Sequence, residues 1–225
     1  MKHQSLSASL AGLGLAAMWL WATGCANTHT VVVEIPPLID LQPYQTIGIV
    51  EFSSTSPQAN DALNQLATQK FMSYIQGAQP QVRFLELGPE AQVLHIVGRE
   101  RLDLDALKAI GKKYGIGSIF TGVYEISDVK PSVSIGGDLT SLSVSAAVNI
   151  SLVSKHWDTK TGATIWTDSS HGQWNVAGFH KEADLPGSIS ISSPGDSYGR
   201  YIEQLDYQVT DSFRTHYQRR TVPNQ

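Results

Sequence analysis

The chain has 225 residues, of which 41% are apolar and 16% are charged, and its formal net charge is −4. This length suits one domain with a packed core, so the composition excludes a wholly disordered chain. A single cysteine excludes a disulfide scaffold and a zinc site built from cysteines, and a mildly acidic chain without a long basic run is a poor nucleic-acid binder.

The amino terminus has the pattern of an export signal. Lys2 is followed by an uncharged, largely apolar stretch over 6–21, which as a helix would span about 24 Å. A hydrocarbon core is ~30 Å thick, so this stretch is short for a permanent transmembrane helix. We therefore expect a cleaved signal peptide over 1–24, with an uncleaved transmembrane helix as the alternative.

The signal ends in Ala22, Thr23, Gly24 and Cys25. This sequence resembles the bacterial lipobox, in which a small residue precedes a cysteine that is acylated and becomes the new first residue. It departs from the usual pattern at Ala22, where leucine is commoner; simple cleavage beside an unmodified cysteine is the alternative. The resemblance implies that acylated Cys25 binds outer-membrane lipid and holds the protein on the periplasmic face, because several acyl chains attach a protein durably.

Residues 25–45 contain three prolines and are typical of an extended tether, with a short strand at 31–33. Residues 46–52 are β-branched and apolar, which predicts a strand covered on both faces. Ser56 and Pro57 predict the start of a helix, and Gly77 predicts its end.

A second strand is expected over 82–87 and a second helix over 103–114, which Gly115 ends. Three extended segments follow, at 118–135, 139–157 and 163–176, and a last helix starts at Pro194. The predicted order is β-α-β-α-β-β-β-α, which indicates an α/β fold. We expect a single three-layer-like domain over 46–216, a mixed sheet with helices packed on it, and a tail over 217–225.

Gly136 and Gly137 suggest a two-residue hairpin turn, in which the numbers of opposite residues sum to 273. Val123 would then lie opposite Ile150, on the apolar face of the hairpin. Pro131 favours an edge position for the first strand. The apolar residues at the hairpin tip are candidates for a partner or subunit contact: Val129, Val133, Ile135, Leu142 and Val144. They could pack on the chain's own body, on a neighbouring subunit or in lipid.

Three tryptophans are further candidates for a contact: Trp157, Trp166 and Trp174. Aromatic strand residues commonly pack between a sheet and a helix, and they are also enriched in protein interfaces and at membrane surfaces. Both interpretations stay open at the level of sequence.

Three local sequences carry a further resemblance: YQTIGIVEF at 44–52, IGKKYGIGSIFTG at 110–122 and DTKTGATIW at 158–166. In this order they resemble a family of bacterial envelope lipoproteins that includes CsgG, LpoB, PelC and the amino-terminal domain of TolB. The resemblance covers residues 44–216. It implies that the chain binds partner proteins or assembles into rings, and it brings no shared catalytic residues.

No phosphate-binding glycine loop, nucleophile elbow or zinc-binding histidine motif occurs, so we expect no enzyme activity and no cofactor. His156, His171 and His180 lie in one region of the sequence. The predicted hairpin separates His156 from His171 by on the order of 25 Å, which is too far for a shared metal ion. We expect these histidines at the surface or rim.

The sequence thus predicts an outer-membrane-anchored periplasmic lipoprotein that acts as a protein-binding or assembly component of an envelope system. Secretion, polysaccharide export and regulation of peptidoglycan synthesis are the candidate systems. Envelope proteins and further copies of the chain are the expected partners. The alternative is a CsgG-like secretion pore that inserts β-hairpins into the outer membrane.

Overall fold

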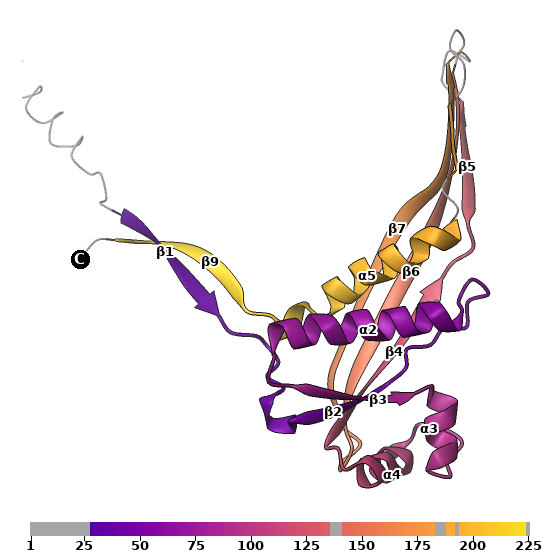
Figure 1. Ribbon diagram of the computed structural model, residues 1–225. Coiled ribbons are helices and arrows are strands. Elements are labelled where there is room, and N and C mark those ends of the chain that lie inside the picture. Colours follow the sequence, from indigo (N-terminus) through magenta and orange to yellow (C-terminus); the bar gives the residue numbers. More distant parts are fainter. Residues whose placement is uncertain (1–27, 136–140, 183–187, 192–193, 224–225) are drawn as a thin grey trace, which may run out of the picture. The chain divides into compact units, whose positions relative to one another are not determined.

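A computed structural model describes residues 28–135, 141–182, 188–191 and 194–223 (Figure 1). It divides the chain into two compact units. One unit combines residues from the two ends of the chain, up to Pro36 and from Thr215, and the other spans Pro37–Arg214. Each unit is described by itself below.

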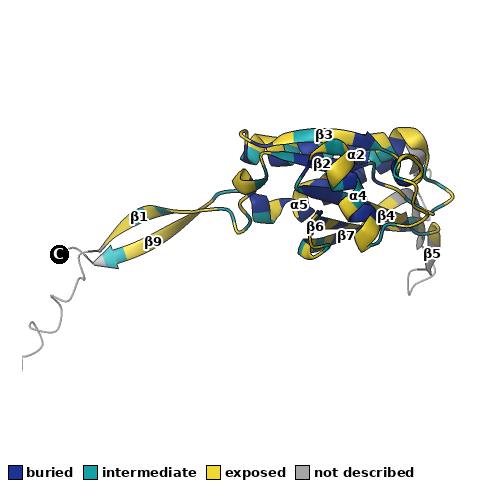
Figure 2. Ribbon diagram, turned by 90° about the horizontal axis from the view of Figure 1, so that it is seen from below, coloured by how far each residue is buried: buried dark blue, intermediate teal, exposed yellow. Residues whose placement is uncertain are grey.

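The terminal unit is a two-stranded antiparallel ribbon. Strand β1 (Thr28–Ile35) pairs with β9 (His216–Pro223), with Thr28 opposite Pro223 and Ile35 opposite His216. The segment expected as a tether therefore contains a strand of eight residues, and its partner forms most of the segment expected as a tail. Residues 29–35 and 216–222 of the ribbon are exposed or half-buried (Figure 2).

The larger unit contains one mixed sheet of seven strands in the order β3-β2-β4-β6-β7-β8, with β5 pairing beside β6. Strand β2 pairs in parallel with β3 and β4, and the remaining pairs are antiparallel. The strands are β2 (Thr46–Val50), β3 (Arg83–Gly88), β4 (Ser118–Ile126), β5 (Lys130–Ile135), β6 (Ser141–Asp158), β7 (Thr164–Glu182) and β8 (Ser188–Ile191).

Helices cover both faces of this sheet, which confirms the predicted α/β fold with three layers. The helices are α2 (Asp61–Ala78), α3 (Glu90–Ile96), α4 (Leu104–Tyr114) and α5 (Pro194–Val209), with short 3-10 turns η1 (Gln42–Tyr44) and η2 (Asp211–Phe213). The larger core joins the sheet to α2 and α5 and includes Phe52, Phe71, Phe120, Leu205 and Phe213. The smaller core joins the opposite face to α3 and α4 and includes Val50, Leu107, Ile110 and Ile119. No helix in the described part of the chain is both long and apolar enough to cross a bilayer.

The predicted boundaries of α4 are confirmed. The Asp103 side chain accepts a hydrogen bond from the Ala106 N–H, and Gly115 ends the helix in the left-handed conformation at φ 68°. The predicted start of α2 is wrong, because Asn60 rather than Ser56 caps the helix and accepts from the Leu63 N–H at 2.9 Å. The helix also runs through Gly77 to Ala78.

The predicted hairpin register is wrong by several residues. Val133 lies opposite Val144, so residue numbers in the β5–β6 pair sum to 277, and Val123 lies opposite Val153 in the β4–β6 pair, where they sum to 276. The expected turn at 136–137 lies outside the described residues. Pro131 does occupy an edge position, since β5 pairs only with β6 in the described sheet.

The change between the two sums occurs at Ser127, between β4 and β5. The Ser127 N–H donates to the Asn149 carbonyl at 2.8 Å, and the Asn149 N–H donates to the Ser127 Oγ at 2.9 Å. The Ser127 side chain thus accepts a hydrogen bond that a backbone carbonyl would accept in a regular sheet. This shifts the pairing with β6 by one residue between β4 and β5. Tyr124 and Ile126 therefore face the core, while Val123, expected on the same face as the hairpin's apolar residues, is 46% exposed.

Candidate interaction surface

The lipidation motif predicted at Ala22, Thr23, Gly24 and Cys25 lies outside the described residues. The residues of the predicted hairpin tip belong to an antiparallel sheet of four strands. We call β5, residues 141–147 of β6, residues 175–182 of β7 and β8 the four-stranded extension. It continues beyond α2 and α5 because β6 and β7 have 18 and 19 residues (Figure 1).

Cross-strand rows in the four-stranded extension alternate in residue type. One row runs through Val133, Val144, Phe179 and Ile189, and the next runs through Ser132, Ser145, Gly178 and Ser190. Ile135 and Leu142 form a further opposite pair. Neighbouring residues of a strand belong to opposite faces, so apolar types share one face and serines share the other. Val129, just before β5, is 38% exposed.

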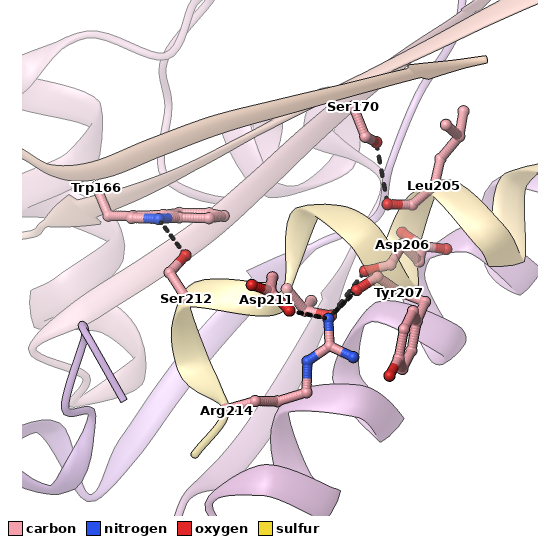
Figure 3. A network of polar contacts seen from close by, with 9 residues as sticks. Trp166, Ser170, Leu205, Asp206, Tyr207, Asp211, Ser212 and Arg214 are labelled. Atoms are coloured by element: carbon pink, nitrogen blue, oxygen red, sulfur yellow. Dashed lines mark hydrogen bonds and ion pairs between the residues drawn. The ribbon is translucent and has the colours of Figure 1, made fainter. Parts of the chain in front are cut away.

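The three candidate tryptophans lie apart from one another. Trp166 is only 8% exposed and packs against Phe213, with ring centroids 4.7 Å apart. Its Nε1–H donates to the Ser212 Oγ at 3.0 Å, and nearby the Ser170 hydroxyl donates to the Leu205 carbonyl (Figure 3). Trp166 thus joins β7 to η2, and Ser170 joins β7 to α5.

Trp174 stacks on Tyr201 of α5 at 4.7 Å and donates its Nε1–H to the Gln204 Oε1 at 3.1 Å. Trp157 lies on the opposite face of the sheet, beside the smaller core, and donates to the Thr121 Oγ1 at 3.0 Å. Each ring therefore has contacts within the unit, and the structure does not bring the three together.

A second surface was not anticipated from the sequence. We call the side of β4, β6 and β7 that α3 and α4 leave uncovered the open face. On it Val123 lies opposite Val153, which is 37% exposed. The next row contains Glu125, Ser151 and His171, side by side on the three strands. The signal was the alternation of polar with apolar residues in 149–152, which predicts a strand with one exposed face.

A cleft of about 590 Å³ lies at the end of the open face. Its polar lining includes Ser56, Glu125, Asn149, Ser151, His171 and Gln173. These groups offer hydrogen-bond donors and acceptors at one place. Within the described residues, no set of three or more His, Cys, Asp or Glu side chains is arranged to hold a metal ion.

The expected surface position is wrong for His156. This residue is fully buried, its ring stacks on Phe120 at 4.2 Å, and it meets the Tyr44 ring edge-on at 5.1 Å. Neither ring nitrogen has a hydrogen-bond partner, and burial lowers the pKa of His156 to about 4. His156 is neutral at physiological pH.

The other two histidines differ from His156. His171 is exposed and lies opposite Ser151, and His156 lies opposite Trp166. The two histidines are thus five rows apart, or roughly 17 Å along the strands instead of 25 Å. The side chain of His180 lies outside the described part of the chain.

Comparisons with known proteins give distant likenesses. No protein-family model matches this chain. A segment is 30% identical over 76 residues to an F-box protein from Arabidopsis thaliana, covering 34% of this chain and 21% of that protein, so the chain spans about a fifth of the length of the curated relative it matches.

Among solved structures, the fold is similar to the PelC dodecamer from Paraburkholderia phytofirmans at 10% identity and a TM-score of 0.37, over 83% of this chain and 98% of that one. It is also similar to the LpoB C-terminal domain from Salmonella enterica at 11% identity and a TM-score of 0.34, over 72% of this chain and 94% of that one. At such identities, and with TM-scores below 0.5, neither likeness assigns a family or a function to this chain.

Proposed function

We propose that this chain is an outer-membrane lipoprotein, acylated at Cys25, whose larger unit binds envelope proteins or further copies of itself through the four-stranded extension. The observation that carries the proposal is the alternation in that extension, where an apolar row such as Val133–Val144 is followed by a row of serines. A sheet with this pattern is stable when a partner covers its apolar face.

The strand edges of the extension support the same proposal. In the described sheet, β5 pairs only with β6 and β8 pairs only with β7, so each has one edge whose backbone groups are available. An edge of this kind can pair with a strand of another chain, which supplies directional hydrogen bonds in addition to apolar burial.

The lipid and the sheet would have separate roles. Acyl chains on Cys25 would restrict the protein to the membrane surface, which raises the effective concentration of its partners there. The surface would then serve as an assembly component in secretion, polysaccharide export or regulation of peptidoglycan synthesis, with a ring of copies as the oligomeric form.

The variant Val133→Ser/Val144→Ser tests the surface. Its matched control is Val123→Ser/Val153→Ser, because both pairs lie directly opposite each other in the sheet. Light scattering of the full chain in detergent should show the mass of an oligomer. The mass should fall in the first variant and stay the same in the control. Photo-crosslinkers at 133 and 144 should likewise form adducts in cells, whereas those at 123 and 153 should not.

A monomer that also forms no adduct at 133 or 144 contradicts the proposed surface. The anchor is tested separately by Cys25→Ser, which should release the protein from the envelope fraction. If that variant stays with the membranes to the same extent as the original chain, acylation is not what holds it there.

The pore remains the second candidate, and the same alternation favours it, since a membrane-crossing strand also presents apolar residues on one face only. Channel conductance after reconstitution of the purified protein separates the two functions. A pore conducts, and the conductance should fall in Val133→Ser/Val144→Ser; a protein-binding module gives no channels.

A further inference from the structure

A cleft of about 570 Å³ lies between α4 and the turn that joins β6 to β7. Its charged lining side chains are Lys108 and Lys112 of α4 and Lys160 of the turn, and all three are exposed. The chain as a whole carries a net charge of −4, so three cations around one concave site are a local reversal of the overall charge. We call this site the lysine cleft.

The carboxylates near the lysine cleft have hydrogen-bond or ion-pair partners other than the three lysine side chains. The Asp158 carboxylate accepts hydrogen bonds from the Lys160 and Thr161 N–H groups, at 2.8 and 2.7 Å, and from the Thr161 hydroxyl at 2.9 Å. These bonds, that of the Thr161 N–H above all, lower the pKa of Asp158, and the positive charge of Lys160 adds to this effect. At the other end of α4, Asp105 lies 3.7 Å from Arg99. None of the three lysines forms an ion pair with a carboxylate of the described chain.

The two walls of the cleft are fixed to each other by Thr159. Its hydroxyl donates to the Ile116 carbonyl at 2.8 Å, and its N–H donates to the Gly117 carbonyl at 3.0 Å. A Cβ added at Gly111 of α4 would lie 2.6 Å from Thr159, so the helix and the turn are in close contact. The helix and the turn that carry the lysines are therefore held in place before a ligand binds, which reduces the entropy lost on binding.

The glycines at the mouth of the cleft leave room for a ligand. A Cβ added at Gly115 would meet no atom within 4 Å, and one added at Gly117 would meet only the Tyr44 ring, at 3.9 Å. A helix C-terminus favours lysine in its last turn, which accounts for Lys112. It does not account for Lys160, which comes from a separate element, or for Lys108 one turn earlier.

We propose that the lysine cleft binds a ligand carrying two or more negative charges on phosphate groups, held between Lys108, Lys112 and Lys160. Lysine binds phosphate as a point charge, and a cleft of this volume fits a small ligand or a single headgroup. A soluble phosphorylated compound and a lipid headgroup that ends in a phosphate monoester share this chemistry. The site does not depend on the function proposed above.

The experiment titrates the full chain in detergent with pyrophosphate and, separately, with a short-chain phosphatidic acid, whose phosphate monoester carries up to two negative charges, below its micelle concentration. Binding is followed by calorimetry and by amide shifts of Gly115, Gly117 and Lys160. We expect saturable binding that weakens between about 20 mM and about 300 mM salt. An exposed charge contact is worth up to about fivefold in affinity, so Lys112→Gln/Lys160→Gln should weaken binding by several-fold and by at most roughly 25-fold.

The matched control is Arg83→Gln/Lys155→Gln, which removes two positive charges from exposed positions elsewhere in the larger unit. It should bind as the original chain does, and Lys112→Arg/Lys160→Arg should retain most of the affinity. Binding of pyrophosphate alone identifies a soluble ligand, and binding of the lipid alone identifies a headgroup. Binding of neither probe, or equal losses in the glutamine variant and the control, overturns the proposal.

Discussion

Replacing His156 with phenylalanine should change how the stability of the protein depends on pH. The imidazole is fully buried, it stacks on Phe120, and neither nitrogen has a hydrogen-bond partner. Phenylalanine keeps a ring of similar shape in the stack and removes two buried nitrogens, each of which costs about 1–3 kcal/mol when it lacks a partner. At about pH 7.5 the free energy of unfolding of the variant should therefore be at least as large as that of the original chain.

The pH dependence follows from the pKa of His156. Burial lowers this pKa from 6.5 to about 4, so between these values the unfolded chain binds a proton that the folded chain does not. The stability contributed by neutral His156 is fully present above pH 6.5 and is lost as the pH falls toward 4. At about 1.4 kcal/mol for each pKa unit, the loss approaches about 3 kcal/mol.

The measurement is urea unfolding of both proteins at several values between about pH 7.5 and pH 4. The quantity compared is the difference in their free energies of unfolding, because the contributions of all other titrating groups cancel in it. This difference should grow by about 3 kcal/mol in favour of the variant as the pH falls. His171→Phe, which removes an exposed imidazole, should not reproduce this growth. A constant difference across the range would refute the reasoning.

Three further substitutions test the packing of the larger unit, each by urea or thermal unfolding. The Asp206 carboxyl group is fully buried and neither of its oxygens has a hydrogen-bond partner, and burial raises its pKa. The stability that it contributes is therefore lost as the pH rises through that folded pKa. Asp206→Asn should stabilise the protein at pH 7 and do so less at pH 4, and an equal effect at both values contradicts this. Gly122→Ala would put a Cβ 2.4 Å from the Phe52 ring and should cost about 1–3 kcal/mol, whereas a neutral result would show that the ring moves freely. Asn60→Ala removes the cap of α2 and should cost about 1 kcal/mol, a loss that Asn60→Asp should largely avoid.

Local signals in the sequence predicted the helices well where they are unambiguous. Asp103 and Gly115 delimit α4 because a capping carboxylate and a left-handed glycine each satisfy backbone groups that the helix leaves free. Around α2 two capping residues compete, Ser56 and Asn60. The structure uses the one adjacent to the helix, while the Ser56 hydroxyl accepts from the Ile126 N–H at 2.7 Å. Only the tertiary contact distinguishes them.

The registers could not be predicted because they depend on single residues far apart in the chain. Ser127 shifts the ladder by bonding to Asn149, and no periodicity in either strand reports this contact. The burial of His156 was missed for a similar reason. Its alternation with Ser154 and Leu152 places it on the core face, but the polarity of its ring favoured a surface position. The pairing of β1 with β9 joins segments nearly 190 residues apart, which no local pattern predicts.

That last pairing matters for anyone who labels this protein. Because Thr28 lies opposite Pro223, a fluorophore attached at position 223 would lie about 5 Å, one interstrand spacing, from the strand that follows the predicted acylation motif. Such a label would therefore report on the amino-terminal strand of the ribbon as well as on its own strand. Reporters of the larger unit belong in that unit's own loops.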